Sequence, residues 1–268
     1  MSASLRGNVR PQRPRPSATL PLGLAAFAVI TWVSLSEQFG IGLDIGQLVA
    51  DMTRGADILG ELLSPNWSFL PRTAGPMLET FKMAVLASLV GCGIGLPVAF
   101  LASRVTAPTR PVLIISRSIL SVIRAIPDIL YALIFVAAIG IGPLPGIAAL
   151  VLFNIGVVAK LRSEAVGGVD TGPVEAARAA GGDRTQTVRW AVFPQVLPNY
   201  VAYALYTFEL NIRASTVIGI VGAGGIGNLL STQYRFFNWS NVSVIIVQLF
   251  VFVFFIELIS IVLRRRLV

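Results

Sequence analysis

Long apolar stretches alternate with short polar segments along most of the chain, and this alternation predicts an all-α membrane protein. Each stretch is near or above the roughly 17 residues that a helix needs to cross the hydrocarbon core of a bilayer. None of the segments between them is long enough for a separate globular domain. Six spans are predicted, at residues 19–35, 78–103, 112–141, 145–165, 197–212 and 242–263.

The first 75 residues differ in character from the rest. Residues 1–17 are rich in Arg and Pro and almost free of apolar side chains, which predicts a disordered tail. The first span follows and has no clear cleavage site of small residues, so it is interpreted as a retained signal anchor. The composition of residues 40–73 predicts an extracytoplasmic loop with one or two surface helices, for instance near 45–63. The resulting division is a tail (1–17), a first span with its loop (18–75) and a core membrane domain (76–268).

Basic residues are distributed unevenly between the two predicted sides of the membrane. Most of the 21 Lys and Arg residues fall in the tail, in the segments around Arg104 and Arg162, and at the C-terminal end. Cytoplasmic loops are enriched in Lys and Arg, so this asymmetry places both termini in the cytoplasm. The net charge of +8 is therefore explained by the concentration of basic residues on the cytoplasmic side. It does not indicate nucleic-acid binding, because no basic patch is interleaved with aromatic residues.

Composition supports the membrane assignment and narrows the chemistry. Hydrophobic residues make up 55% of the chain and charged residues 13%, about half the share of a typical soluble domain. Cys92 is the single cysteine and histidine is absent. An intrachain disulfide is therefore impossible, and a metal site built from His and Cys is excluded.

The polar segment, residues 173–194, lies between two predicted spans and has the pattern of two short helices. Asp170 or Thr171 can cap the first helix, which places Pro173 in the first turn, where its missing N–H is harmless. Gly181 and Gly182 then end this helix in the left-handed region that glycine allows.

The second short helix of the polar segment begins at Asp183, with Gln186 three residues later as a capping-box partner. The alanines of the first helix form a smooth, weakly hydrophobic face. A face of this kind would bind lipid headgroups poorly. It favours docking of a protein from the cytoplasm over the alternative, an amphipathic helix on the membrane surface.

The sequence E-A-A at 175–177, followed by Gly181 and later by Pro194, resembles the EAA loop of membrane subunits of binding-protein-dependent ABC importers. That family pattern places Ile and Leu near its end, where this chain has Ala191 and Phe193. Three further segments, 79–104, 124–135 and 208–230, are similar to phosphonate-type importer permeases. The resemblance covers roughly residues 75–266.

This resemblance implies a type I importer permease fold in the bacterial inner membrane, without catalytic residues. Its coupling residues would be Glu175, Ala176, Ala177, Gly181 and Gly182, on a coupling helix (173–183) that docks into a cytosolic ATPase. The implied assembly is a homodimer with two ATPase subunits and an extracytoplasmic substrate-binding protein, surrounded by lipid. ATP and Mg would be used by the ATPase, and this chain would bind no cofactor. The implied cargo is a phosphonate or a related phosphorus oxyanion.

A second motif has the letters of a dinucleotide-binding fingerprint, with Gly222, Gly224 and Gly227 in the order G-x-G-x-x-G and Gly225 between them. No βαβ unit surrounds it, so nucleotide binding is rejected. Two interpretations remain open. The glycines can unwind a helix beside a wet cavity on the substrate path, or they can allow close helix packing.

Two pairs of opposite charges lie four residues apart in predicted spans: Arg124 with Asp128, and Glu209 with Arg213. On a helix such pairs can meet. A charge at mid-membrane costs at least about 3 kcal/mol without compensation, so pairing or a wet cavity is expected. The pairs either lock helices together or line the path, where a guanidinium can guide an oxyanion.

Other functions remain as alternatives to the phosphorus-oxyanion permease. The chain could be an ABC permease for another small solute, or an anion channel or carrier that works without an ATPase. An intramembrane enzyme would need His, Cys or clustered acids at one depth, and the sequence offers no such constellation.

Overall fold

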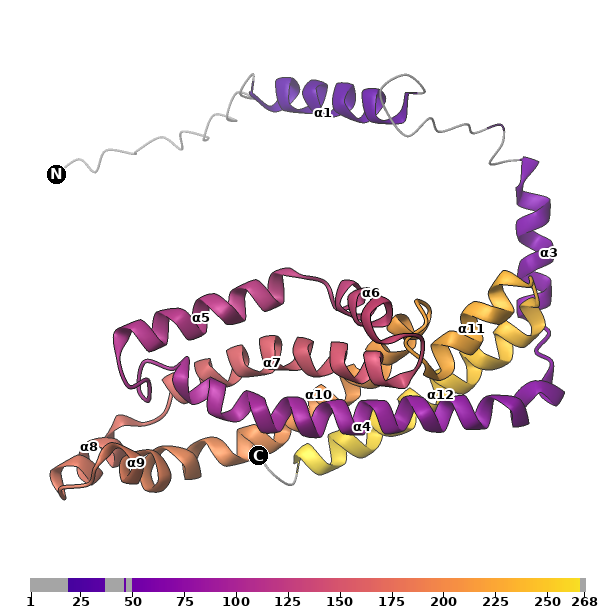
Figure 1. The fold of residues 1–268 in the computed structure, drawn as a ribbon. Helices are drawn as coiled ribbons and strands as arrows, with labels where there is room; N and C mark the ends of the chain where they lie inside the picture. Colours follow the sequence, from indigo (N-terminus) through magenta and orange to yellow (C-terminus); the bar gives the residue numbers. More distant parts are fainter. Residues whose placement is uncertain (1–18, 37–45, 47–49, 266–268) are drawn as a thin grey trace, which may run out of the picture. The chain divides into compact units, whose positions relative to one another are not determined.

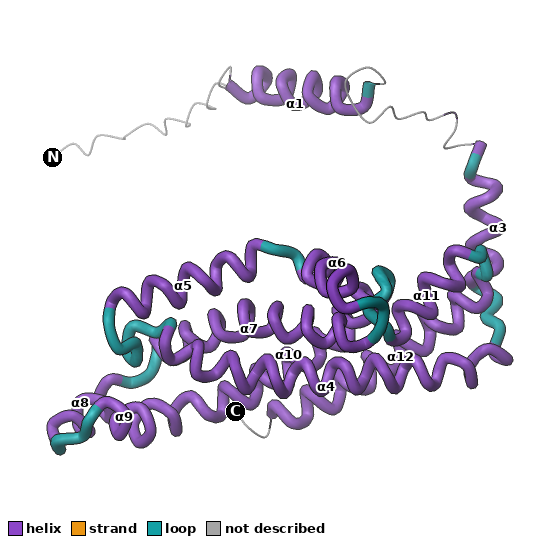
Figure 2. The backbone as a smooth tube through the Cα atoms, in the orientation of Figure 1, coloured by secondary structure: helices purple, strands orange, loops and turns teal. Residues whose placement is uncertain are grey.

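The computed structural model describes residues 19–36, 46 and 50–265 (Figure 1). Within these ranges all regular structure is helical and no strand occurs, as the colouring in Figure 2 shows, so the all-α prediction is confirmed. The predicted disordered tail, 1–17, lies outside the described residues. The chain divides into two units, Met1–Asp57 and Ile58–Val268, which are described separately.

The first unit contains α1 (Thr19–Leu35), a 17-residue helix with the bounds predicted for the first span. It is apolar throughout, and it is shorter than the helices of the second unit that are long enough to cross a membrane. Helix α3 (Met52–Leu62) begins in this unit and falls within the surface helix predicted at 45–63.

The second unit is a bundle of long helices joined by short turns (Figure 1). Its elements after α3 are η1 (Trp67–Phe69), α4 (Leu70–Leu101), α5 (Arg110–Ala125), α6 (Asp128–Ile139), α7 (Pro143–Gly167), α8 (Thr171–Ala179), α9 (Arg184–Thr187), η2 (Val188–Val192), α10 (Phe193–Gly219), α11 (Gly225–Arg235) and α12 (Trp239–Arg265).

Among the described residues, three helices are long and apolar enough to span a bilayer: α4 together with η1, α7 and α12. A fourth span exists if α5 and α6 count as one. Helix α10 matches α12 in length, but it is not apolar enough to be counted with them. The multi-pass character is thus supported, whereas six crossings and two cytoplasmic termini stay predictions.

The predicted span 112–141 is two helices rather than one. Helix α5 ends at Ala125, α6 begins at Asp128, and the two axes differ by 84°. Ile126 between them is extended (φ −95°, ψ 124°) because the ring of Pro127 disfavours the helical region for the residue before it. Pro127 therefore breaks the predicted span outright.

Helices α4 and α7 pack closely because α4 carries small residues at their contact. A Cβ atom on Gly91 would lie 2.6 Å from Cβ of Asn154, so only glycine permits this approach. The buried Asn154 side chain donates a hydrogen bond of 3.1 Å to the carbonyl of Ala87. Such polar contacts between helices are a common stabilising element where the surroundings are lipid.

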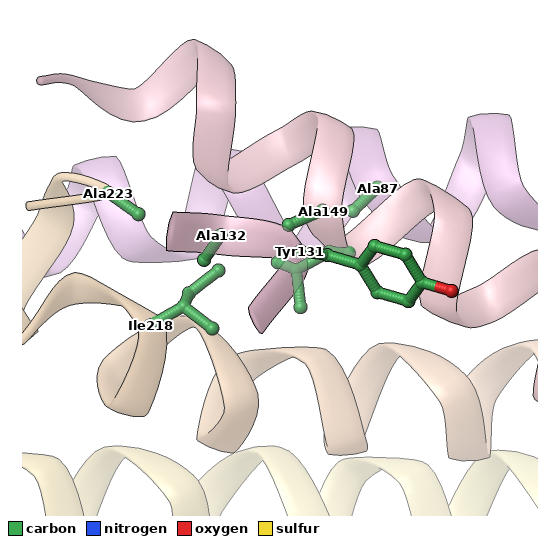
Figure 3. Close-up of a cluster of buried hydrophobic side chains, with 7 residues drawn as sticks. Ala87, Tyr131, Ala132, Ala149, Ile218 and Ala223 are labelled. Carbon is green, nitrogen blue, oxygen red and sulfur yellow. The ribbon is translucent and has the colours of Figure 1, made fainter. Parts of the chain in front are cut away.

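A buried cluster joins α4, α6, α7, α10 and the turn before α11 (Figure 3). Alanines predominate in it, and they let the five segments approach one another closely. The largest member, Tyr131, donates a hydrogen bond of 2.9 Å to the carbonyl of Ile123, which ties α6 back to α5 across the break. The cluster consists of Ala87, Tyr131, Ala132, Ala149, Leu150, Ile218 and Ala223.

Candidate functional site

The polar segment folds as the two capped helices that the sequence predicted. Of the two candidate caps, Asp170 is the one used: its carboxylate accepts a hydrogen bond of 2.9 Å from the N–H of Gly172. At the other end of α8, Gly181 adopts φ 82°, and its N–H donates to the carbonyl of Arg178. This is the left-handed helix ending that glycine favours.

Helix α9 begins with the predicted capping box. The N–H of Gln186 donates to the Asp183 carboxylate at 2.7 Å, and the N–H of Asp183 donates to the Gln186 side chain at 2.9 Å. The helical run then continues without interruption through η2, a π-helical turn, into α10. Pro194 has no N–H to donate four residues back, and the turn that precedes it is widened. The polar segment is therefore joined stiffly to the bundle.

One face of α8 is anchored in the bundle and the other is free. Val174 is buried in a cluster with Val166 and Val192. Glu175, Ala176, Ala179 and Gly181 are exposed, whereas Ala177 and Gly182 are half-buried. Thus three of the five predicted coupling residues lie on the free surface, and the other two support the turn behind it.

The glycine motif lies at a break between two helices, as one interpretation of the sequence predicted. Helix α10 ends at Gly219 and α11 begins at Gly225, with positive φ at Gly222 (92°), Gly224 (81°) and Gly225 (68°). The second interpretation holds as well. A Cβ on Gly225 would lie 2.5 Å from the Thr80 hydroxyl oxygen. The motif therefore both interrupts a helix and permits close packing.

A cavity of about 460 Å³ adjoins this break. Of the four predicted path glycines only Gly222 lines it, while Gly224, Gly225 and Gly227 are buried in helix contacts. The polar lining comes from one face of α11, namely Asn228, Ser231, Thr232 and Arg235. The sequence analysis missed these side chains, although their spacing of three and four residues marks one face of a helix.

Arg124 and Asp128, expected either to pair or to line a wet path, form no ion pair in the described structure. Arg124 is in the last turn of α5 and donates to the carbonyl of Leu120 at 3.3 Å. Asp128 begins α6, and its carboxylate accepts from the N–H of Ile129 at 2.9 Å. Pairing at a spacing of four residues requires a continuous helix, and the break at Pro127 interrupts it.

The second predicted pair is confirmed and belongs to a larger network. Arg213 and Glu209 are 2.6 Å apart on α10, and α12 adds Arg264, 3.3 Å from Glu209, and Glu257, 3.5 Å from Arg213. The Glu209 side chain is 7% exposed, whereas those of Arg213 and Glu257 are 48% and 44% exposed. Two acids balance two arginines, so the network is neutral and joins α10 to α12.

Sequence reasoning counted Arg162 among the cytoplasmic charges, but it is fully buried in the bundle. Its guanidinium lies 3.8 Å from the centre of the Tyr200 ring and donates to the carbonyl and sulfur of Cys92, both at 3.3 Å. The Arg162 Nε has no partner, and no carboxylate among the described residues pairs with this side chain. The contact joins α7, α10 and α4.

Comparison with known proteins shows which family the chain resembles. The profile of the family described as binding-protein-dependent transport system inner membrane component matches residues 95–268. The phosphite transport system permease protein PtxC of Stutzerimonas stutzeri is 38% identical over 244 residues, which are 91% of this chain and 89% of that protein. The phosphate-import permease protein PhnE of Mycolicibacterium smegmatis is 40% identical over 190 residues, 71% of this chain and 36% of that protein.

Solved structures show the same fold. A membrane chain from a structure titled as inward-facing conformations of the MetNI methionine ABC transporter superposes with a TM-score of 0.66 at 26% sequence identity. The match covers 73% of this chain and 96% of that chain.

Proposed function

The chain belongs to the family of binding-protein-dependent transport system inner membrane components, and from that premise we propose that it is the permease subunit of an ATP-driven importer for phosphonates or related phosphorus oxyanions. It acts in the bacterial cytoplasmic membrane as a homodimer that carries two cytosolic ATPase subunits. An extracytoplasmic protein delivers the substrate. ATP and Mg are used by the ATPase, and this chain binds no cofactor.

The observation that carries the proposal is the construction of α8. One face of this helix is fixed in the bundle through Val174, and the opposite face presents Glu175 and Ala176. The segment continues through α9 and η2 directly into α10. A displacement imposed on the free face is therefore transmitted to α10 as a stiff unit, which is the mechanical property that an ATPase-driven membrane subunit requires.

The charge network and the cavity support a path for an anion. Arg213 on α10 and Glu257 on α12 are each about half exposed, and charges facing lipid are costly. The open side of the network therefore faces a second copy of the chain or a wet path. The cavity beside Gly222, just after the C-terminal end of α10, offers hydroxyl and amide groups together with Arg235. We assign the extracytoplasmic part of the path to this cavity.

The phosphorus chemistry is suggested by the relatives. Their names specify phosphite and phosphate transport, and a guanidinium recognises a tetrahedral oxyanion through paired hydrogen bonds. A path needs to bind its cargo weakly enough for release, so recognition is expected to reside mainly in the delivering protein.

The coupling proposal is tested by placing a bulky side chain on the free face of α8. Ala176→Trp should abolish both phosphonate uptake and permease-stimulated ATP hydrolysis in proteoliposomes that contain the ATPase and the delivering protein. Glu175→Ala should weaken both. Ala74→Trp, at an exposed position near the start of α4, is the matched control and should leave both activities unchanged.

Two results would refute the proposal. Full stimulation of the ATPase by the Ala176→Trp permease would show that α8 is not the docking surface. Uptake that persists without the ATPase and ATP would instead identify a channel or a carrier.

A further inference from the structure

A basic pocket of about 430 Å³ lies on the anchored side of α8, between this helix and the segment that follows α4. Three arginines from three elements line it: Arg104 after α4, Arg178 in the last turn of α8, and Arg184 at the start of α9. Valine side chains, including Val105 and Val174, contribute an apolar wall.

The positive charge of this pocket is not compensated within the described structure. None of its described lining residues is acidic, and none of the three arginines forms an ion pair with a described residue. Arg184 donates to the carbonyl of Thr106, which holds the α9 side of the pocket to the end of α4. Asp183, the acid next to Arg184 in the sequence, uses its carboxylate in the capping box of α9.

The pocket and the free face of α8 are separate surfaces. Val174 and Arg178 are one helical turn apart and line the pocket, whereas Glu175 and Ala176 are exposed and do not line it. A partner docked on the free face therefore leaves the pocket available.

We propose that this pocket binds a phosphate group and thereby fixes α8 to the end of α4. Guanidinium groups pair with phosphate oxygens through charge-assisted hydrogen bonds, and three of them converge here from separate elements. The phosphate can be free in the cytosol or can be the headgroup of an anionic phospholipid, since basic pockets at the cytoplasmic ends of spans accept such headgroups. Binding itself is independent of the transport proposal. Only its consequence, restricted movement of the coupling helix, rests on that proposal.

The test measures binding to the purified full-length chain in nanodiscs, with no ATPase present. In the first arm, radiolabelled inorganic phosphate is titrated into nanodiscs of neutral lipid. In the second arm, the chain is released from nanodiscs that contain phosphatidylglycerol, and native mass spectrometry counts the phosphatidylglycerol molecules that stay bound to it. Arg178→Gln with Arg184→Gln should lower the affinity for the bound species at least about tenfold. Arg189→Gln should have no effect, because this exposed arginine of the same segment does not line the pocket.

Each result decides the matter. Arginine-dependent binding of inorganic phosphate supports the free anion, and arginine-dependent retention of phosphatidylglycerol supports the headgroup. If neither species binds, or if binding is equal in the double variant, the proposal is overturned. Arg104→Gln alone should also weaken binding. Because this variant does not alter α8 or α9, it provides the test if the double variant fails to fold. Failure of this test leaves the coupling test on Ala176 untouched, so the two proposals are distinguishable.

Discussion

The buried stack of Arg162 on Tyr200 allows a prediction of stability that differs from that for an ordinary ion pair. Arg162 is fully buried, and the Tyr200 ring, 3.8 Å from the guanidinium, takes the place of a carboxylate. The Tyr200 hydroxyl also donates to the carbonyl of Cys92 at 3.0 Å. The Arg162 guanidinium is therefore stabilised by the Tyr200 ring, whereas the Tyr200 hydroxyl has a hydrogen bond that does not involve Arg162.

The magnitudes follow from these contacts. Tyr200→Phe keeps the ring and loses one hydrogen bond, which should cost about 1 kcal/mol of the free energy of unfolding. Tyr200→Leu also removes a desolvated cation–π contact of about 2 kcal/mol, so its total should be about 3 kcal/mol. Arg162→Met removes the charge that needs compensation, and replacing a buried charge by an apolar group of similar volume is often neutral or stabilising.

The decisive measurement is a double-mutant cycle. In Arg162→Met with Tyr200→Leu the loss should be smaller than the sum of the single losses, by about 2 kcal/mol. Unfolding of the purified chain in mixed micelles of increasing SDS content, followed by circular dichroism, gives the free energies. Tyr206→Leu is the matched control, since Tyr206 is on the same helix, is 38% exposed and should lose less than about 1 kcal/mol.

Additive losses in the cycle would show that the Tyr200 ring does not stabilise the Arg162 charge. A loss in Tyr200→Leu no larger than that in Tyr206→Leu would show the same. Either result would mean that the charge of Arg162 is compensated by something other than the ring.

Three further predictions concern the helix contacts. Gly227→Ala places a methyl group against a backbone carbonyl of α10 and should lower the free energy of unfolding by about 1–3 kcal/mol or more. The yield of folded protein, measured by size-exclusion chromatography, should fall accordingly. Gly93→Ala is the control, since its methyl group would meet open space and should leave this yield unchanged. Asp183→Ala removes the α9 cap and should cost about 1 kcal/mol, visible as faster hydrogen exchange over 184–187. Glu209→Gln leaves two arginines without their shared acid and should lower the melting temperature clearly, whereas the half-exposed Glu257→Gln should lower it little.

Much of the local structure is predictable because its causes lie within a few residues. The Asp183 capping box, the left-handed Gly181 and the break of the helix at the glycine motif depend on backbone chemistry that the sequence states directly. Ion pairing between residues four apart on a helix is likewise predictable from spacing, and Glu209 and Arg213 form such a pair. It fails for Arg124 with Asp128 because the intervening proline ends the helix on which the spacing argument depends.

The sequence by itself determined that this chain is helical, where its apolar helices lie, and that one polar segment is a capped unit distinct from them. Only the tertiary structure decided which way each helix faces. In a membrane protein the side chains toward lipid and toward protein are both apolar, so the hydrophobic pattern carries little information about rotation around the helix axis. For this reason the burial of Arg162 against Tyr200, the contribution of α12 to the charge network and the cavity beside Gly222 became visible only when the helices were packed together.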